Sequence, residues 1–498
     1  MSQLLRTKSI DRLVEQAEEP ERRLRKTLGP WSLTALGVGA VIGTGVFVLT
    51  GTAAAGETVP FPSILKAPLL DLLLHGKDTL SIAGRPGAGP GIALSYLLTA
   101  VVCSFAALCY AELASMIPIA GSAYTYAYAT LGEIFAWIIG WDLILEYAVS
   151  NMAVAVGFSA YLNDVLESLT GFAFPAKLAN PPIVAGVYSG NWFNLPSLIV
   201  VMLLTMLLIR GVRESAEANN VMVSVKVVAI LIFVVGASRA VHTENWHPFL
   251  PNGGQGLLTG AAIVFFTYIG FDSVSTAAEE CRHPQRDLPL GILATLVMCA
   301  LLYVSVALVL TGIVNWRSLN NAAPVANALK SLGMENIRRC VDIGALVGML
   351  SSLVVFQYGQ ARVWFAMSRD GLLPPVFSSV HPRFRTPHIS TWIAGLAVGI
   401  PAGIWDLGTF ADLSNIGTLF AFVVVSFGVI VLRRTQPERR RGFRVPWVPF
   451  LPLVSVAFCI LLMASLPLET WIRFVVWLII GLFIYFLFGK KHSEFANG

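Results

Sequence analysis

The first long apolar stretch of this chain carries four glycines between Gly37 and Gly45, in the sequence GVGAVIGTGVF. Glycine weakens a helix interior by about 1 kcal/mol relative to alanine, so the stretch is predicted to unwind near Gly43. Unwinding exposes amide N–H groups, which suit a carboxylate, and carbonyl groups, which suit an ammonium. A ligand that carries both charged groups close together is an α-amino acid. Close helix packing through small residues is the alternative explanation for these glycines.

A second candidate is Lys226, which lies inside another apolar stretch, NNVMVSVKVVAILIFVVG. An ammonium near the middle of a membrane costs about 2.5–3.5 kcal/mol on insertion scales, so a lysine there is by default a functional hypothesis. The alternative is that the side chain extends to the cytoplasmic end of its helix, about two turns away.

Carboxylates form a third group of candidates. Asp142 and Glu146 are four residues apart and share one face of a helix, with no basic residue nearby in their own stretch. Because unpaired carboxylates are costly in lipid, both are expected to face the protein or to be protonated. Glu146 is the candidate for a pocket or proton-relay group, and Asp142 for a structural role. Asp272 is expected to cap a half-helix or to steer a cation, and Glu112 to pair with a cytoplasmic arginine.

The composition indicates that a membrane must surround the elements that position these residues. Of 498 residues, 56% are hydrophobic and 13% are charged, whereas soluble domains carry roughly 25% charged residues. Apolar stretches of about 20 residues, the length that crosses ~30 Å of hydrocarbon, recur along the chain. We predict an all-α integral membrane protein with twelve transmembrane helices, near residues 31–53, 91–116, 134–162, 195–210, 217–237, 257–279, 288–314, 341–367, 388–405, 410–432, 448–466 and 471–488.

The distribution of basic residues predicts the orientation of these spans. With the N-terminus inside, 22 of the 34 Lys and Arg residues fall in the two tails and the even loops, 9 fall in the odd loops and three lie within spans. Because basic loops favour the cytoplasm, we expect both termini there, in a cell (plasma) membrane. The arginine-rich loop at 433–444 is expected to lie beside anionic lipid.

A weak internal symmetry divides the chain. The sixth predicted span carries FFTYIGFDSVS, with Gly270 and Asp272 in its middle, and five spans separate it from the glycine-rich first span. An odd number of spans inverts the second repeat, and interrupted helices at matching positions of inverted halves point to the central site of a transporter. We predict a cytoplasmic segment (1–30), a first repeat (31–241, with an extracytoplasmic insertion at about 57–89), a second repeat (257–432), a loop with helices 11 and 12 (433–488) and a cytoplasmic tail (489–498).

Several other classes of protein lack their signatures in this sequence. No zinc-ligand spacing, nucleophile elbow or GxxxxGK[ST] loop is present, so we expect neither an enzyme nor an ATP-driven pump, and no metal or cofactor. The basic residues do not alternate with exposed aromatic residues, which argues against nucleic acid as a partner. No filter-like loop repeats, which argues against a channel.

Seven sequence stretches together resemble a known family. They are GVGAVIGTGVFVLTGTAAA, ALCYAELASMIPIAGSAYTYAYATLGE, WIIGWDLILEYAV, FFTYIGFDSVSTAAEE, SRDGLLP, LSNIGTLFAF and GFRVPWVP, and they extend over nearly the whole chain. The chain resembles a bacterial member of the cationic amino acid transporter family, within the amino acid–polyamine–organocation superfamily. This resemblance implies a LeuT-like fold, with two inverted five-helix repeats and two further helices. The insertion at 57–89 is the main departure from the family pattern.

The resemblance also implies where the substrate binds. Its backbone would lie against residues of the first span, which are Ile42, Gly43, Thr44 and Gly45. Facing carbonyls and a gating ring would come from the sixth span, from Phe266, Thr267 and Ile269. Lys226 occupies the place where sodium-coupled relatives bind an ion, which suggests proton coupling. Phe356, in the eighth span, would line the side-chain pocket.

We therefore expect a secondary active permease, with proton-coupled symport of small neutral amino acids such as alanine. The bulky apolar ring of Phe356 would shrink the pocket and offer no oxygen to a guanidinium. An exchanger, or a transporter of cationic amino acids, is the alternative. The expected partners are the substrate, protons and membrane lipids, with a small accessory subunit or a homodimer as further possibilities.

Overall fold

The computed structural model describes residues 3–11, 28–57, 63, 84–119, 121–184, 186–210, 216–321, 323–384 and 386–493. The side chains of residues 3, 216–219, 276, 279 and 280 also lie outside this description. The predicted cytoplasmic segment (1–30) and the insertion at 57–89 therefore fall largely outside the described residues.

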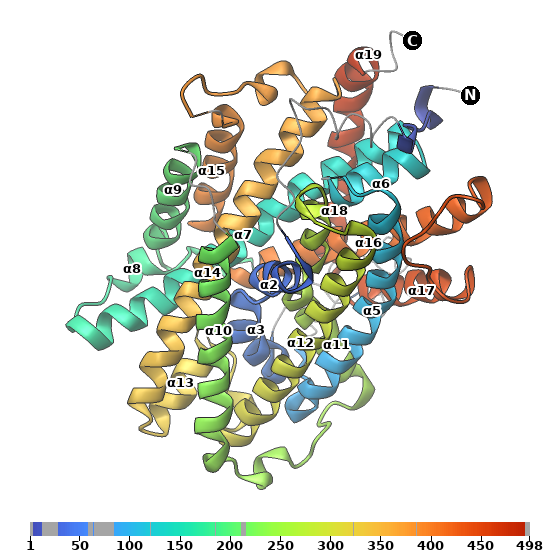
Figure 1. Cartoon of the computed structure of the whole chain (residues 1–498). Coiled ribbons are helices and arrows are strands. Elements are labelled where there is room, and N and C mark those ends of the chain that lie inside the picture. The colour runs from blue at the N-terminus through green and yellow to red at the C-terminus, as the bar shows by residue number, and fades with distance from the viewer. Residues whose placement is uncertain are drawn as a thin grey trace, which may run out of the picture.

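The described chain folds as a bundle of α-helices (Figure 1). These helices are α2 (Pro30–Val41), α3 (Thr44–Ala55), α5 (Ile92–Met116), α6 (Ser122–Thr130), α7 (Glu133–Thr170), α8 (Ala176–Ala179), α9 (Leu195–Ile209), α10 (Ala216–Ala237), α11 (Gly253–Val264), α12 (Pro284–Ile313), α13 (Pro324–Ser331), α14 (Glu335–Arg369), α15 (His388–Ala402), α16 (Leu407–Thr435), α17 (Phe450–Ala464), α18 (Leu468–Ile484) and α19 (Lys490–His492).

Short elements connect and extend these helices. The 3₁₀-helices are η1 (Gln3–Leu5), η3 (Gly89–Gly91), η4 (Ser238–Ala240), η5 (Thr243–Trp246), η6 (Phe265–Tyr268), η7 (Phe271–Glu280), η8 (Trp316–Ser318) and η9 (Pro375–Ser378), and a π-helical turn, η10 (Tyr485–Gly489), follows α18. Two antiparallel pairs of two-residue strands are present, β1 (Gly56–Glu57) with β2 (Arg85–Pro86) and β3 (Ile183–Val184) with β4 (Val187–Tyr188).

Eight of the described helices are long and apolar enough to cross a membrane, or nine if the bent pair α2 and α3 is one span. Three shorter apolar helices, α9, α15 and α17, coincide with three further predicted spans. Each of the twelve predicted ranges thus contains a helix, whereas the count of twelve crossings stays a prediction. Helix α7 continues beyond the third predicted span, to Thr170.

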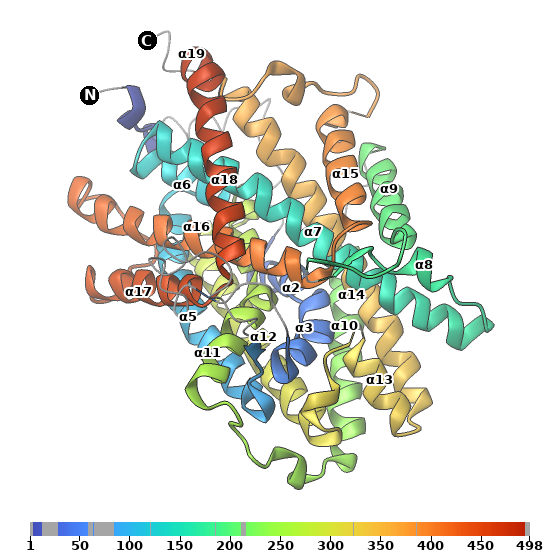
Figure 2. The ribbon, with the colours of Figure 1, turned by 180° about the vertical axis from the view of Figure 1, so that it is seen from behind.

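Helices that are five spans apart in the predicted order lie against one another. Thus α5 packs on α12, α7 on α14 and α9 on α15. The contact of α10 with α14 has its counterpart in the contact of α16 with α7. Likewise, the contact of α2 with α12 has its counterpart in the contact of α11 with α5. The two halves of the bundle therefore repeat one pattern of contacts around the broken helices in its centre (Figures 1 and 2).

The N- and C-terminal ends of the chain lie at the same end of the bundle (Figure 1). There, the amide of Lys8 donates to the carbonyl of Tyr128, and the Lys8 ammonium lies 3.1 Å from a carboxylate oxygen of Asp370. Glu112, at the end of α5, forms ion pairs with Arg433 and Arg441, at 2.7 and 3.0 Å. The predicted pairing of Glu112 with an arginine is confirmed.

Candidate functional site

The first predicted span is broken where its glycines cluster. Helix α2 ends at Val41, α3 begins at Thr44, and the two axes differ by 48°. Gly43 has a non-helical backbone, and no side chain caps the start of α3. The first amide groups of a helix have no partner within it, so those of α3 are donors at the break. The predicted unwinding near Gly43 is confirmed.

The sixth predicted span is irregular at the matching place. After α11 the chain continues as the 3₁₀-helix η6, then passes through Ile269 in an extended conformation and Gly270 with a φ of +113°. A φ in this range strains any residue with a Cβ atom, which explains the glycine. The predicted interruption at Gly270 is present, but among the described helices the one pair bent by more than 40° at a short break is α2 and α3 of the first span.

The two breaks lie directly against each other. A Cβ atom built on Gly45 would come within 2.6 Å of the Thr267 side chain, and one built on Gly270 within 3.1 Å of Ala40. Each irregular segment therefore packs on the other span, and glycine permits both approaches. The structure brings the predicted residues of the first and sixth spans together, as the resemblance implied.

The Lys226 side chain lies at the first break and is fully buried. Its Nζ atom donates to the carbonyl oxygens of Gly39 and Ile42, at 2.6 and 2.9 Å, and to the hydroxyl of Ser351 at 2.8 Å. The first two acceptors are carbonyls at the end of α2, which the break leaves without partners in the helix. The alternative that Lys226 extends to the cytoplasmic surface is excluded by these contacts.

Two serines of α14, Ser351 and Ser352, also contact the groups at the first break. The sequence did not single them out as site residues. The hydroxyl of Ser352 lies 3.3 Å from the Gly39 carbonyl oxygen and 3.4 Å from that of Ile42. Ser351 accepts from Lys226 and donates to the carbonyl of Gly348 at 2.9 Å. The available signal was a pair of adjacent hydroxyl residues in the middle of an otherwise apolar span.

Tyr303, on α12, connects the two breaks from the opposite side. Its buried hydroxyl lies 3.1 Å from the carbonyl oxygen of Val41 and 2.9 Å from that of Thr267. Because a hydroxyl has one proton, it donates fully to only one of these acceptors at a time. This pair of carbonyls can therefore accept from a second donor.

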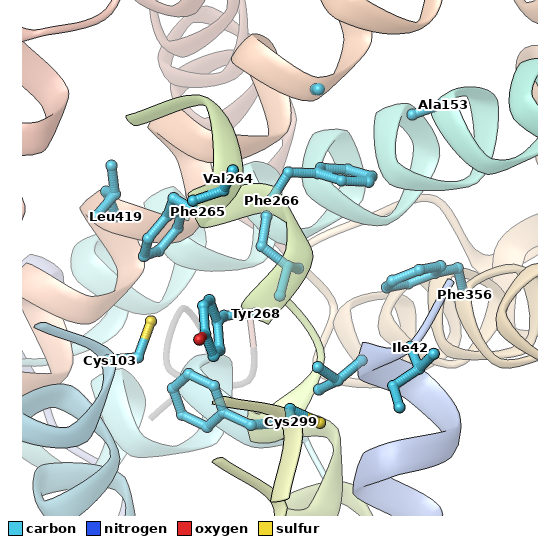
Figure 3. Close-up of a cluster of buried hydrophobic side chains, with 14 of the residues drawn as sticks. Ile42, Cys103, Ala153, Val264, Phe265, Phe266, Tyr268, Cys299, Phe356 and Leu419 are labelled. Carbon is cyan, nitrogen blue, oxygen red and sulfur yellow. The ribbon is translucent and has the colours of Figure 1, made fainter. Parts of the chain in front are cut away.

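Apolar side chains surround the same region (Figure 3). The close-up shows Ile42 beside Phe356, and Phe266 directed toward the helix that carries Ala153, while Phe265 points away. The rings of Phe356 and Tyr147 are 6.1 Å apart and tilted. All of these side chains are buried. The predicted pocket residues Phe266 and Phe356 thus lie near the breaks, and Ala153 is a neighbour that the sequence did not single out.

The three predicted carboxylates are all buried, and they are neighbours in space. Glu146 is within hydrogen-bonding reach of Thr418 on α16 and close to Asp142 and Asp272. Among the residues that the structure describes, neither oxygen of Asp142 has a hydrogen-bond partner. Asp272 accepts from the Ser122 hydroxyl at 3.3 Å and from backbone amides at the start of η7, including that of Ser273. Of the two predicted roles for Asp272, these contacts correspond to capping.

In the part of the chain that the structure describes, no group of three or more His, Cys, Asp or Glu residues is arranged to hold a metal ion. The donor set at the breaks consists of backbone amides and carbonyls, hydroxyls and one ammonium. Backbone amides at a helix start suit a carboxylate, and free carbonyls suit an ammonium.

Comparison with known proteins places the chain in a family. A family model described as amino acid permease matches residues 28–486. A methylthioribose transporter of Bacillus subtilis is 43% identical over 493 residues, with 99% of each chain covered. The branched-chain amino acid permease BcaP of the same organism is 44% identical, with 99% of this chain and 98% of that protein covered.

A plant relative extends the similarity to the cationic transporters. The chloroplastic cationic amino acid transporter 9 of Arabidopsis thaliana is 34% identical, with 95% of this chain and 89% of that protein covered. Together with the broken spans and the apolar helices around them, these matches show that the chain belongs to the amino acid permease family of the amino acid–polyamine–organocation superfamily, and is a multi-pass membrane transporter rather than an enzyme.

Proposed function

We propose that this permease is a secondary active symporter that couples the uptake of small neutral amino acids to protons. The observation that carries the proposal is the buried ammonium of Lys226 on the carbonyls of Gly39 and Ile42 at the first break. The substrate backbone binds at Gly43, Thr44 and Gly45 and at the facing carbonyls of the sixth span.

Proton coupling follows from the chemistry of this contact. A charged Lys226 supplies three donors and holds the end of α2 against α14 through Ser351. A deprotonated amine has two donors and no charge, so its hydrogen bonds to the carbonyls of Gly39 and Ile42 are weaker. Loss of the proton therefore loosens the helix end that binds substrate, and Glu146 offers a buried carboxylate on α7 as a second proton acceptor.

The arrangement of helices supports an alternating-access mechanism. We propose twelve spans in a LeuT-like arrangement, with the repeats 31–241 and 257–432 inverted relative to each other. The matched contacts between the two halves and the break in both central spans support this. Both termini are proposed to be cytoplasmic, in the plasma membrane, as the excess of Lys and Arg in the even loops indicates.

The substrate class follows from the side chains around the breaks. Ile42, Phe266 and Phe356 are apolar, and none of them can accept a hydrogen bond from a guanidinium. Alanine is the first candidate substrate. The printed name of the 44% identical relative makes valine, leucine and isoleucine the second candidates.

The test is uptake into proteoliposomes that contain the purified full chain. Radiolabelled alanine, valine and arginine are compared, with and without an inward proton gradient. Uptake of a neutral amino acid that the gradient drives, and that a protonophore abolishes, is the expected result. Uptake that requires amino acid inside and ignores the gradient identifies an exchanger, and preferred uptake of arginine overturns the assignment of the pocket.

A further inference from the structure

A hollow of about 570 Å³ lies where three of the predicted spans end. Its lining includes Met116 at the end of α5, Gln285 at the start of α12, Arg439 and Arg440 in the loop after α16, and Asp11 of the N-terminal segment. The volume is within the range of ligand pockets, ~300–1,000 Å³. We name it the arginine hollow.

The loop that supplies these arginines is held in place by a buried carboxylate. Glu112, at the end of α5, accepts from the guanidinium groups of Arg433 and Arg441 and from the backbone amide of Val445, at distances from 2.7 to 3.0 Å. Arg441 also donates to backbone carbonyls between residues 432 and 439. Because these bonds fix the loop, its other arginines can bind a ligand without the entropy cost of ordering a flexible segment.

Two arginines of this loop are available to a ligand. In the part of the chain that the structure describes, Arg440 and Arg444 are exposed and form no hydrogen bond or ion pair. Arg439 pairs with Asp11 at 2.7 Å, but the side chain of Asp11 is 73% exposed. An exposed ion pair contributes little to stability. An anion that offers several oxygens can therefore displace Asp11 from Arg439.

Aromatic side chains indicate that the arginine hollow lies at the membrane surface. Trp447 and Phe450, which follow the loop, are 77% and 65% exposed. Phe450 begins α17, one of the shorter apolar helices, so Trp447 lies at the end of a predicted span. Exposed tryptophan at the end of a span is typical of the headgroup layer of a bilayer. Arginines within a few residues of such an end attract anionic lipid.

The lining of the arginine hollow matches the headgroup of an anionic phospholipid in its chemistry. Guanidinium groups donate two parallel hydrogen bonds to a phosphate, and the nearby carboxamide of Gln285 can donate to a phosphate oxygen or a headgroup hydroxyl. Met116 and Pro118 give the hollow an apolar edge, which suits the glycerol backbone of a lipid. Free phosphate would leave this edge and the exposed Trp447 without a partner, so a membrane lipid is the better match.

We propose that the arginine hollow binds the headgroup of an anionic phospholipid through Arg439 and Arg440, and that Asp11 competes with the lipid for Arg439. Lipid binding then exchanges the contact of the N-terminal segment with the loop for a contact with the bilayer. The site is separate from the proposed substrate site, and its ligand does not depend on which amino acid is transported.

The test measures lipid binding to the purified full chain in a neutral detergent. Phosphatidylglycerol and phosphatidylcholine with the same acyl chains are titrated, and bound lipid is counted by native mass spectrometry. We expect phosphatidylglycerol to bind in preference. Arg440→Gln should weaken its binding about tenfold, because charge-assisted hydrogen bonds are lost. Asp11→Asn should strengthen its binding, because the competing carboxylate is removed.

Matched variants separate this site from general attraction to charge. Arg434→Gln is the control, since Arg434 is exposed on the same loop but does not line the hollow. Arg440→Lys keeps the charge and should retain part of the lost binding. Equal weakening in Arg434→Gln, or unchanged binding in Arg440→Gln, overturns the site. Unchanged or weaker binding in Asp11→Asn overturns the competition.

A third arm distinguishes the two sources of phosphate. Inorganic phosphate, at the concentration of the lipid, should not displace phosphatidylglycerol, because it lacks the glycerol and acyl groups. Displacement by inorganic phosphate, or equal binding of phosphatidylcholine, overturns the assignment to an anionic lipid. Amino acid uptake is not measured in any arm, so a failure of the proposed transport function leaves this comparison valid.

Discussion

At the scale of single residues, the site depends on groups that satisfy carbonyls freed by the broken helices. Lys226 occupies the carbonyls of Gly39 and Ile42, and Tyr303 lies between those of Val41 and Thr267. A buried charge that loses its partners is strongly unfavourable, so the Lys226 ammonium and the break stabilise each other.

Replacing Lys226 tests the source of proton coupling. Lys226→Met removes the titrating group and its donors, so we expect proton-driven uptake to fall at least about tenfold, with the residual uptake insensitive to the gradient. Uptake at several pH values, with and without a gradient, measures this. Arg362→Met is the control, because Arg362 is also a basic residue within a span but lies over the ring of Tyr358. Gradient-driven uptake that survives in Lys226→Met would assign coupling to another group.

Replacing Phe356 tests the size and polarity of the side-chain pocket. Phe356→Ser removes the ring beside Ile42 and adds a hydroxyl, so longer or cationic side chains should enter, with arginine uptake rising about tenfold. Phe356→Leu keeps the site apolar and should not admit arginine. Competition of alanine uptake by unlabelled arginine gives the comparison. Identical arginine uptake in the parent chain and in Phe356→Ser would remove Phe356 from the pocket.

At the scale of elements, the two irregular segments function as one unit because they touch. The close approach of α3 to η6 is possible only without a side chain at Gly45, and that of η7 to α2 depends on Gly270. Both contacts join residues more than 200 positions apart in the chain. Movement of either segment therefore displaces the other, which is what coupled binding and gating require.

Substitution of Gly45 measures this dependence. Gly45→Ala places a methyl group within 2.6 Å of Thr267, so the breaks must separate, at a cost of roughly 1–3 kcal/mol. We expect a loss of uptake of at least about tenfold and a lower unfolding temperature. Gly254→Ala is the matched control, because a Cβ atom there meets nothing within 4 Å. Wild-type uptake by Gly45→Ala would show that the approach of the two segments is not needed.

At the scale of the whole molecule, charge clusters hold each end of the bundle. At one end, Lys8 pairs with Asp370 and Glu112 with Arg433, which connects the N-terminal segment and the arginine-rich loop to the helices. At the other end, the guanidinium of Arg85, on β2, pairs with the carboxylates of Glu57 and Asp412. Ion pairs connect separate segments at both ends of the bundle in this structure, so separation of these segments at either end requires ion pairs to break.

The sequence alone determined the class of protein, the approximate helices and the family. A long apolar stretch is stable only in lipid or in a protein core. Its length therefore identifies a candidate span without knowledge of the helices that pack against it. The same holds for Gly43 and Gly270, whose local effect on a helix does not depend on packing. Asp142 and Glu146 were expected to be buried for a similar reason, since lipid excludes unpaired charge.

The tertiary structure decided which groups meet. Lys226 could have extended to the surface, and only the packing of α10 against α2 and α14 placed its ammonium at the break. Ser351, Ser352 and Tyr303 are unremarkable in the sequence because hydroxyls are common in helices. Arg85 meets Asp412 across 327 positions of the chain. Such contacts depend on the relative placement of distant helices, which no local pattern of residues specifies.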